Sequence, residues 1–516
     1  MPTPFRTPAR RIRKAAPASH RFSPASERLE ARALLSGPGS LDTTFGTGGL
    51  AAADLTAGSD QANAVAVQVD GKLVDAGQAN GQSSFGTVRF NADGSIDTSY
   101  ATGGKVTTSF AGALGATAND VALQSDGKAV LAGWQQRKMV SGTGNNQVTT
   151  YPYDFALVRY TAAGAIDPTF GSGGKVITSF GTTGSGYARG VVVQADGKIV
   201  AGGLSNTSGQ NNFTLIRYNP DGSLDTGFGA GGIVTTNLST ASRISRLLIQ
   251  SDGKLVAAGY TLPNNLAGYG HVMTVVRYNL DGSFDTTFGS GGVVSIPNPP
   301  GTNTQRDARG AALQPDGKIV IDALYSPNNQ FDLVRLNTDG TLDTTFGTGG
   351  EVLTTFPATD NARYPNAVTV QSDSKIVVGG YASGTISYGS PATIAVRYNP
   401  DGSLDTGFGN GGVAAAATYN IGYAVAIQPS TGRIVVAGRN NGNGGQFALT
   451  GFVGGGTATL SASRVAPAST PTRSAITVAS DAPLMFVPPV PSGPAALDWT
   501  FVPGLLSSRK RPRHGP

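Results

Sequence analysis

The feature that most constrains the fold of this 516-residue chain is a phrase that returns seven times. The phrase Leu-Asp-x-x-Phe-Gly-x-Gly-Gly starts near residues 41, 96, 166, 224, 284, 342 and 404, at separations of 55, 70, 58, 60, 58 and 62. A second phrase, Gln-x-Asp-Gly-Lys, follows in five units at 68–72, 124–128, 194–198, 250–254 and 314–318, and weakens at 371–375 and 428–433. A fixed period of this length indicates a repeat architecture, which occupies residues 38–452.

Each unit contains four short apolar segments separated by turn residues. In the third unit these are 176–180, 188–194, 198–202 and 213–218, which we expect to be the first to fourth strands of one blade. An Asp-Gly dipeptide, typical of a tight hairpin, joins the second to the third. In Phe155–Tyr160 odd and even positions are equally apolar, so that strand must be covered on both faces.

Four-stranded antiparallel sheets stacked around an axis meet this requirement, so the sequence predicts an all-β, seven-bladed β-propeller. A β-solenoid and a string of β-sandwiches fit less well, because solenoid coils repeat at shorter periods and a sandwich needs more strands than one unit holds. The composition agrees: there are 73 glycines and 30 prolines but only three glutamates, which disfavours long helices.

Segments of the repeats resemble those of a known family. Val191–Lys198, Leu215–Asp225 and Phe228–Gly232 resemble the bacterial delta-60 repeat, a family of predicted β-propeller domains without an assigned activity, and the resemblance covers about residues 41–452. Leu29–Leu35 is similar to the LEPR-xLL motif of bacterial surface proteins, with Ala31 in place of the family's proline. This second resemblance implies an extracellular or cell-surface location.

The net charge of +6 comes from the two ends of the chain. Residues 1–37 and 453–516 hold fourteen of the 38 basic and four of the 32 acidic side chains, which leaves the repeats with 24 basic and 28 acidic ones. We expect 1–37 to be a disordered basic segment of the targeting or surface type, although no standard signal peptide is visible. Residues 453–516 are expected to be a disordered low-complexity linker with a basic tail.

A basic patch on the folded part, as specific nucleic-acid binding would require, is therefore not expected. No run of 18 apolar residues predicts a transmembrane helix, and we expect a monomer.

The most constant polar pair in the repeats is an arginine followed eight residues later by an aspartate. We expect six structural ion pairs: Arg89–Asp97, Arg159–Asp167, Arg217–Asp225, Arg277–Asp285, Arg335–Asp343 and Arg397–Asp405. The segment around Asn91–Gly94 resembles the Asp-x-Asp-x-Asp-Gly-x-x-Asp calcium loop of some propeller blades, with an arginine at the first ligand position. Because a guanidinium there replaces a hard ligand by a positive charge, we expect no metal and no cofactor, with calcium as the alternative.

No catalytic residue is predicted. Only His271 lies within the repeats, cysteine is absent, and Glu351 is the sole glutamate of the body. The aspartates outside the repeated positions leave an Asp-dependent lyase or hydrolase at the channel mouth as the alternative. Segments such as 106–109, taken as first strands, would line the channel with hydroxyl groups, and this disfavours an enzyme.

The variable connections between the third and fourth predicted strands should emerge on one face, and variable loops on a rigid scaffold often bind ligands. Candidate ligand-binding residues there are Trp134, Tyr151, Tyr153, Tyr260, Tyr269, His271, Tyr325, Tyr381 and Tyr388. The alternative is that these rings only cover blade edges. The sequence thus favours a non-enzymatic binding or structural scaffold for polysaccharide or protein ligands.

Overall fold

The computed structural model describes residues 37–143, 146–207, 209–238, 241–262, 270–298, 305–325, 330–356, 363–382, 391–416, 420–442 and 444–455. All of them belong to one compact unit within residues 1–469. Of the two tails expected to be disordered, residues 1–36 and 456–516 lie outside the described residues, as do the Leu29–Leu35 motif, Tyr269 and Tyr388.

The described residues form seven four-stranded antiparallel sheets, and the four strands of each sheet follow a fixed order. The innermost strands are β2 (Gln61–Val67), β6 (Ala113–Leu123), β12 (Ser185–Val193), β16 (Ala241–Ile249), β20 (Arg306–Leu313), β24 (Arg363–Val370) and β28 (Asn420–Ile427). The second strands are β3 (Leu73–Ala79), β7 (Ala129–Arg137), β13 (Ile199–Asn206), β17 (Leu255–Leu262), β21 (Ile319–Tyr325), β25 (Ile376–Ala382) and β29 (Ile434–Asn440). The third are β4 (Ser84–Phe90), β10 (Tyr153–Tyr160), β14 (Asn211–Tyr218), β18 (Val272–Tyr278), β22 (Gln330–Leu336), β26 (Ala392–Tyr398) and β30 (Gln446–Phe452). The outermost are β5 (Lys105–Thr108), β11 (Lys175–Thr178), β15 (Ile233–Thr236), β19 (Val293–Ile296), β23 (Glu351–Thr354), β27 (Val413–Ala416) and β1 (Leu50–Ala53).

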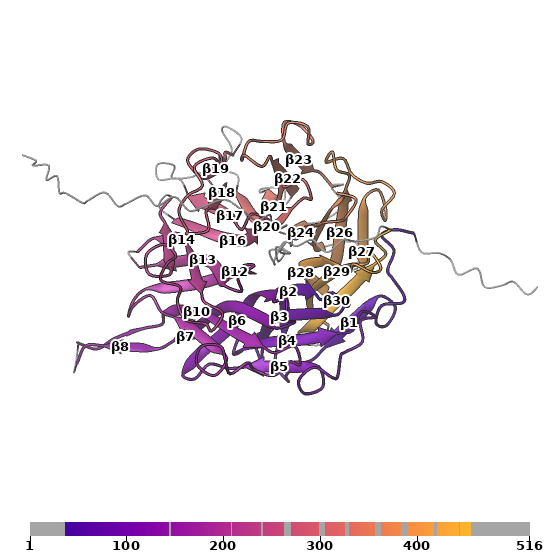
Figure 1. Cartoon of the computed structure of the whole chain (residues 1–516). Helices are drawn as coiled ribbons and strands as arrows, with labels where there is room; N and C mark the ends of the chain where they lie inside the picture. The colour runs from indigo at the N-terminus through magenta and orange to yellow at the C-terminus, as the bar shows by residue number, and fades with distance from the viewer. Residues whose placement is uncertain are drawn as a thin grey trace, which may run out of the picture. The chain divides into compact units, whose positions relative to one another are not determined.

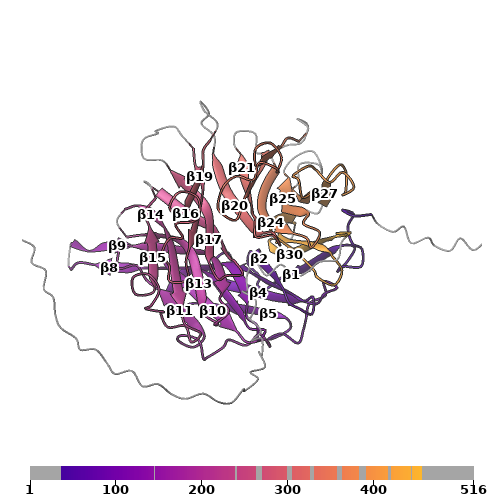
Figure 2. The same ribbon diagram turned by 45° about the horizontal axis from the view of Figure 1, so that its top comes forward.

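The innermost strands of successive sheets contact one another in a closed cycle, since β28 also contacts β2. The seven sheets are therefore arranged as blades around a common axis, an arrangement that can be followed in Figure 1, and the predicted propeller is confirmed. A further hairpin, β8 (Met139–Ser141) and β9 (Val148–Thr150), extends away from the second blade in both views (Figures 1 and 2).

The ring is closed by the beginning of the described chain. Strand β1 pairs antiparallel with β30, so Leu50 faces Thr450 and Ala53 faces Phe447. The seventh blade is thus built from both ends of the repeat region, and its outermost strand comes from the N-terminal side. Opening the ring therefore requires separating β1 from β30.

The cores lie between neighbouring blades. In β10, Phe155, Leu157 and Val158 are all fully buried, which confirms that such strands are covered on both faces. The sequence sets this up because each strand keeps apolar side chains at odd and even positions. At the repeated Asp-Gly turns a positive φ is needed, and Gly197 supplies it with φ +82°.

The predicted strand order is wrong by one position. Residues 176–180, expected to be the first strand of the third unit, overlap β11, which spans 175–178 and is the outermost strand of the preceding blade. The innermost strand of that unit is β12, and 198–202 and 213–218 lie in the second and third strands. The threonines expected in the channel are therefore at the rim of the disc, where Thr108 and Thr178 bond to the hydroxyls of Tyr160 and Tyr218 in the next blade.

Candidate functional site: the polar mouth of the channel

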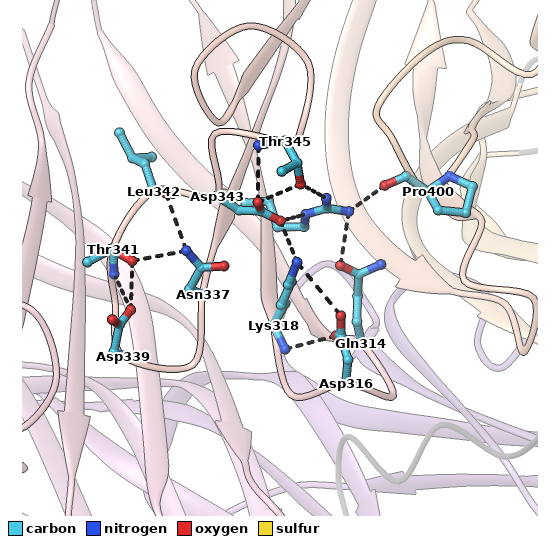
Figure 3. A network of polar contacts seen from close by, with 11 residues as sticks. Gln314, Asp316, Lys318, Asn337, Asp339, Thr341, Leu342, Asp343, Thr345 and Pro400 are labelled. Atoms are coloured by element: carbon cyan, nitrogen blue, oxygen red, sulfur yellow. Dashed lines mark hydrogen bonds and ion pairs between the residues drawn. The ribbon is translucent and has the colours of Figure 1, made fainter.

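One face of the propeller carries the repeated arginines and aspartates. In each of the six predicted pairs, the arginine Nε lies 2.7–2.8 Å from the aspartate Oδ2. A lysine from the Gln-x-Asp-Gly-Lys phrase also reaches the aspartate, as Lys318 does at 2.7 Å from Asp343 (Figure 3). Burial pushes the pKa of Asp343 upward, but hydrogen bonds from Lys318 and Thr345 and the charge of Arg335 outweigh it, so the pKa lies well below its usual range.

The same arginines link one blade to the next. Arg89 donates from Nη1 to the carbonyl of Ala162 at 2.6 Å, and Arg335 donates in the same way to Pro400 (Figure 3). A backbone bond runs beside this contact, from Gly347 N–H to the carbonyl of Asp401 at 2.8 Å. Each arginine therefore neutralises an acid within its own blade and binds a carbonyl of the following one.

A seventh link, which the sequence analysis missed, closes the ring. Gly451 occupies the arginine position on β30, since it faces Val435 as Arg89 faces Val74. Arg433, at the lysine position, supplies the guanidinium instead: its Nε lies 2.6 Å from Asp42 Oδ2 and its Nη1 donates to Ala92 O at 2.7 Å. The sequence did contain an indication of this link, because the weakened seventh phrase has an arginine where the other units have a lysine.

The oxygens of the calcium-like loop have separate partners. Asp93 Oδ1 accepts hydrogen bonds from the backbone and hydroxyl of Ser95, and Asp97 is held by Arg89 and Lys72. Across the described ranges, no group of three or more His, Cys, Asp or Glu side chains could hold a metal ion.

The opposite face carries the variable connections. Since β12 runs antiparallel to β13, with Ser185 opposite Asn206, the connection after β13 lies at the end where the innermost strand begins. The repeated Asp-Gly turns follow the other end of that strand. Repeated and variable features thus occupy opposite faces of the same disc.

The candidate aromatic residues lie mainly on strands beside this variable face. Trp134 in β7 and Tyr153 in β10 pack edge to face at 5.1 Å between ring centroids, and Tyr153 also contacts Tyr187 of the next blade at 4.4 Å. Tyr151 is exposed, and Tyr325 is partly buried at the end of β21. These rings form separate groups rather than one surface.

Two more candidates are stacked. Tyr260 lies against His271 with ring centroids 3.9 Å apart, and Tyr381 lies against Tyr364 at 4.7 Å. His271 Nδ1 forms a short contact with the carboxylate of Asp307 on the neighbouring innermost strand. The lone histidine of the repeats is therefore oriented by an acid at the rim of the channel.

The residues that line the channel were not predicted from the sequence, because the strands expected there lie at the rim of the disc. Every innermost strand has a β-bulge at the same position. The residues at the bulges are Asn63, Asn119, Arg189, Ser245, Arg309, Asn366 and Tyr423. All seven line a cavity of about 280 Å³ together with Arg243, Arg246 and Asp307. Bulges commonly redirect side chains at functional sites.

The remainder of the channel is more apolar. A second cavity of about 540 Å³ is lined by residues that include Val67, Leu123, Leu248, Val370 and Ile427, with Asp120 and Arg246 among them. The polar mouth and this apolar section follow one another along the innermost strands.

A comparison with protein-family models agrees with the fold. Residues 68–100, 124–170, 194–228, 250–288, 314–346 and 371–408 match the model of a β-propeller domain of unknown function, DUF5122. No curated protein matches the chain. Among solved structures, the polysaccharide lyase Uly1 has a TM-score of 0.43 at 11% identity, covering 78% of this chain and 91% of its own.

A protein from Lactobacillus plantarum has a TM-score of 0.38 at 12% identity, with 69% and 88% covered. The PQQ-bound aldose sugar dehydrogenase from Streptomyces coelicolor has a TM-score of 0.37 at 12% identity, with 77% and 96% covered. TM-scores this low do not indicate a shared activity.

Among the described residues there is no helix with the length and hydropathy of a membrane span. Its sheets and its repeated segments show that the chain has a seven-bladed β-propeller fold built from tandem repeats.

Proposed function

We propose that the protein is a non-enzymatic, exported or cell-surface propeller that binds a polysaccharide or protein ligand at its variable face. The supporting observation is the contrast between the two faces. One carries the same Arg–Asp–Lys arrangement in blade after blade, whereas the bulge position of the innermost strands holds asparagine, arginine, serine and tyrosine. Seven similar blades can be held together without different side chains at this position, whereas recognition of one asymmetric ligand requires them.

Export is proposed from the surface-protein motif at Leu29–Leu35. Expression of the full chain in a bacterial host, followed by fractionation and surface proteolysis, tests it. A chain found only in the cytoplasm would contradict export.

Binding can be tested with soluble polysaccharides and with extracts of a bacterial envelope. Tyr364→Ala removes one ring of a stacked pair at the variable face, and Asp316→Asn changes an exposed acid on the repeated face as a matched control. We expect the first variant to bind less and the second to bind normally. Equal binding by both would favour the alternative that the aromatic rings only cover blade edges, and absence of any ligand would refute the proposal.

A second candidate is a propeller enzyme, an Asp-dependent lyase or hydrolase. The observation in its favour is the contact of His271 with Asp307, because a carboxylate that holds Nδ1 leaves Nε2 free to accept a proton. The strands that were expected to line the channel with hydroxyl groups lie at the rim of the disc. Their hydroxyl groups therefore no longer disfavour an enzyme. Release of oligosaccharides by the wild type but not by His271→Gln would support catalysis; no release from any polysaccharide tested would oppose it.

A further inference from the structure

The polar mouth contains more positive charge than its acids balance. Arg189, Arg243, Arg246 and Arg309 line it together with Asp307, and Asp322 on β21 lies close enough to interact electrostatically with Arg246 and Arg309. Asp307 already contacts His271, and Arg309 donates from Nη1 to the amide oxygen of Asn366 at 3.0 Å. Among the described residues, no acid forms an ion pair with Arg189 or Arg243.

Arg189 and Arg243 have the least compensation. The Nε atoms of both are buried and have no hydrogen-bond partner. Burial, followed by the nearby charge of Arg243, lowers the pKa of Arg189 to about 10. A buried donor without an acceptor is destabilising, so these two Nε atoms lower the stability of the fold. Charged groups with a perturbed pKa and an unpaired donor cluster at functional sites, and two such arginines side by side are suited to binding an anion.

Aromatic rings surround the pair. The guanidinium of Arg243 lies 4.9 Å above the ring of Tyr260, which is itself stacked on His271. Tyr187 lies two residues before Arg189 on β12 and belongs to the aromatic group with Tyr153. A planar guanidinium held on a ring keeps its outer edge directed at a ligand, and flat rings nearby suit the apolar faces of sugars.

We propose that Arg189 and Arg243 bind the carboxylate of an acidic polysaccharide at the channel mouth. A carboxylate is planar and has two oxygens, which matches the fork of a guanidinium. The 280 Å³ mouth is near the lower limit of known ligand pockets, large enough for one sugar unit with its carboxylate. This inference rests on the proposed polysaccharide-binding function and specifies its ligand class.

The test is calorimetric titration of the full chain with oligomers of galacturonate, glucuronate and mannuronate, each beside its carboxyl-reduced counterpart. We expect at least one acidic oligomer to bind and its reduced form to bind about tenfold more weakly or worse, the loss of one charge-assisted contact. Arg189→Gln and Arg243→Gln should each weaken binding by a similar factor. Lys138→Gln removes one exposed charge on the same face and should leave it unchanged.

The melting temperature of each variant, measured without oligosaccharide, shows whether the substitution destabilises the fold. Because the buried Nε of Arg189 has no hydrogen-bond partner, Arg189→Gln should melt at or above the wild-type temperature, whereas Arg243→Gln also loses the contact with the ring of Tyr260. The acidic oligomer should raise the melting temperature of the wild type but not of either variant.

Equal affinity for acidic and reduced oligomers, or normal binding by both arginine variants, would overturn the assignment while leaving polysaccharide binding intact. Displacement by an equal concentration of inorganic phosphate would overturn the assignment to a carboxylate. If no oligosaccharide, polymer or envelope protein bound the wild type, the proposed function itself would fail.

Discussion

Replacement of Arg433 should open the propeller at one joint. Its guanidinium holds Asp42 through Nε at 2.6 Å, and Nη1 donates to Ala92 in the first blade and to Gln428 at 2.6 Å. Breaking a buried ion pair by removing one partner costs about 3–5 kcal/mol. Since the Asp42 side chain is 16% exposed and keeps its bonds to Thr44, we expect about 3 kcal/mol for Arg433→Ala.

Arg433→Lys separates charge from geometry. A lysine at the equivalent position, Lys72, reaches its aspartate at 2.9 Å, so the ion pair should survive. The bond to Ala92 would be lost, at a cost of about 1–1.5 kcal/mol. Urea unfolding followed by circular dichroism measures both values at equal protein concentration.

Arg217→Ala is the matched control, because it breaks the same kind of link between the third and fourth blades. Both alanine variants should lose similar global stability. Only Arg433→Ala should speed amide exchange in β1, since that strand is held to the last blade by four paired residues next to the broken link. Equal exchange of β1 in the two variants, or an equal loss for Arg433→Lys and Arg433→Ala, would refute the reasoning.

Three further predictions concern charge. Both oxygens of Asp75 are buried without partners, and burial raises its pKa well above the usual value, so Asp75→Val should stabilise the protein at pH 7 by about 1–3 kcal/mol. The gain should shrink towards pH 4, because the wild type becomes more stable as the unfolded carboxyl takes up its proton; a constant gain in urea melts would contradict this. For Asp97, burial raises the pKa but Ser99, Lys72 and Arg89 lower it further, so its contribution is present above about pH 4 and should be lost in acid. Urea midpoints that stay constant below pH 4 would oppose this. Finally, calorimetric titration of the metal-stripped protein with calcium should show no tight site; several would refute the idea that the arginines replace the ion.

The repeated face could be predicted from the sequence because its contacts are local. Arg89 and Asp97 are eight residues apart, and the turn between them brings them together whatever the neighbouring blade does. The closing pair could not be found in this way, since Arg433 and Asp42 are 391 residues apart and meet only once the ring has closed. To find the closing pair, one must know that Gly451 occupies the position at which the other blades have an arginine.

The channel was mispredicted for a related reason. A repeating sequence has no marked beginning, so its period fixes the number of blades but not which strand lies innermost. Starting each unit at Leu-Asp-x-x-Phe-Gly-x-Gly-Gly placed Val106–Ser109 at the centre, whereas pairing with β4 leaves β5 at the outer edge. Arg189, which lies in a segment read as a second strand, thereby escaped notice.

The bulge position offers a way to separate stability from function at the mouth. At this position Asn119 donates from Nδ2 to the carbonyl of Ala188 at 2.7 Å, and Asn366 donates likewise to Gly422. An asparagine at 189 could donate in the same geometry to Ile244 on the next innermost strand. Arg189→Asn should therefore replace a guanidinium whose buried Nε has no hydrogen-bond partner by an amide that has one, and add about 1 kcal/mol to the free energy of unfolding. The same change should abolish the proposed carboxylate binding, because it removes the charge.

The two outcomes for stability distinguish the roles of Arg189. If Arg189→Asn lowers the stability, Arg189 holds the blades together and the proposal of a ligand site at the mouth is refuted. If it raises the stability and abolishes binding, Arg189 is a residue retained for function although it destabilises the fold.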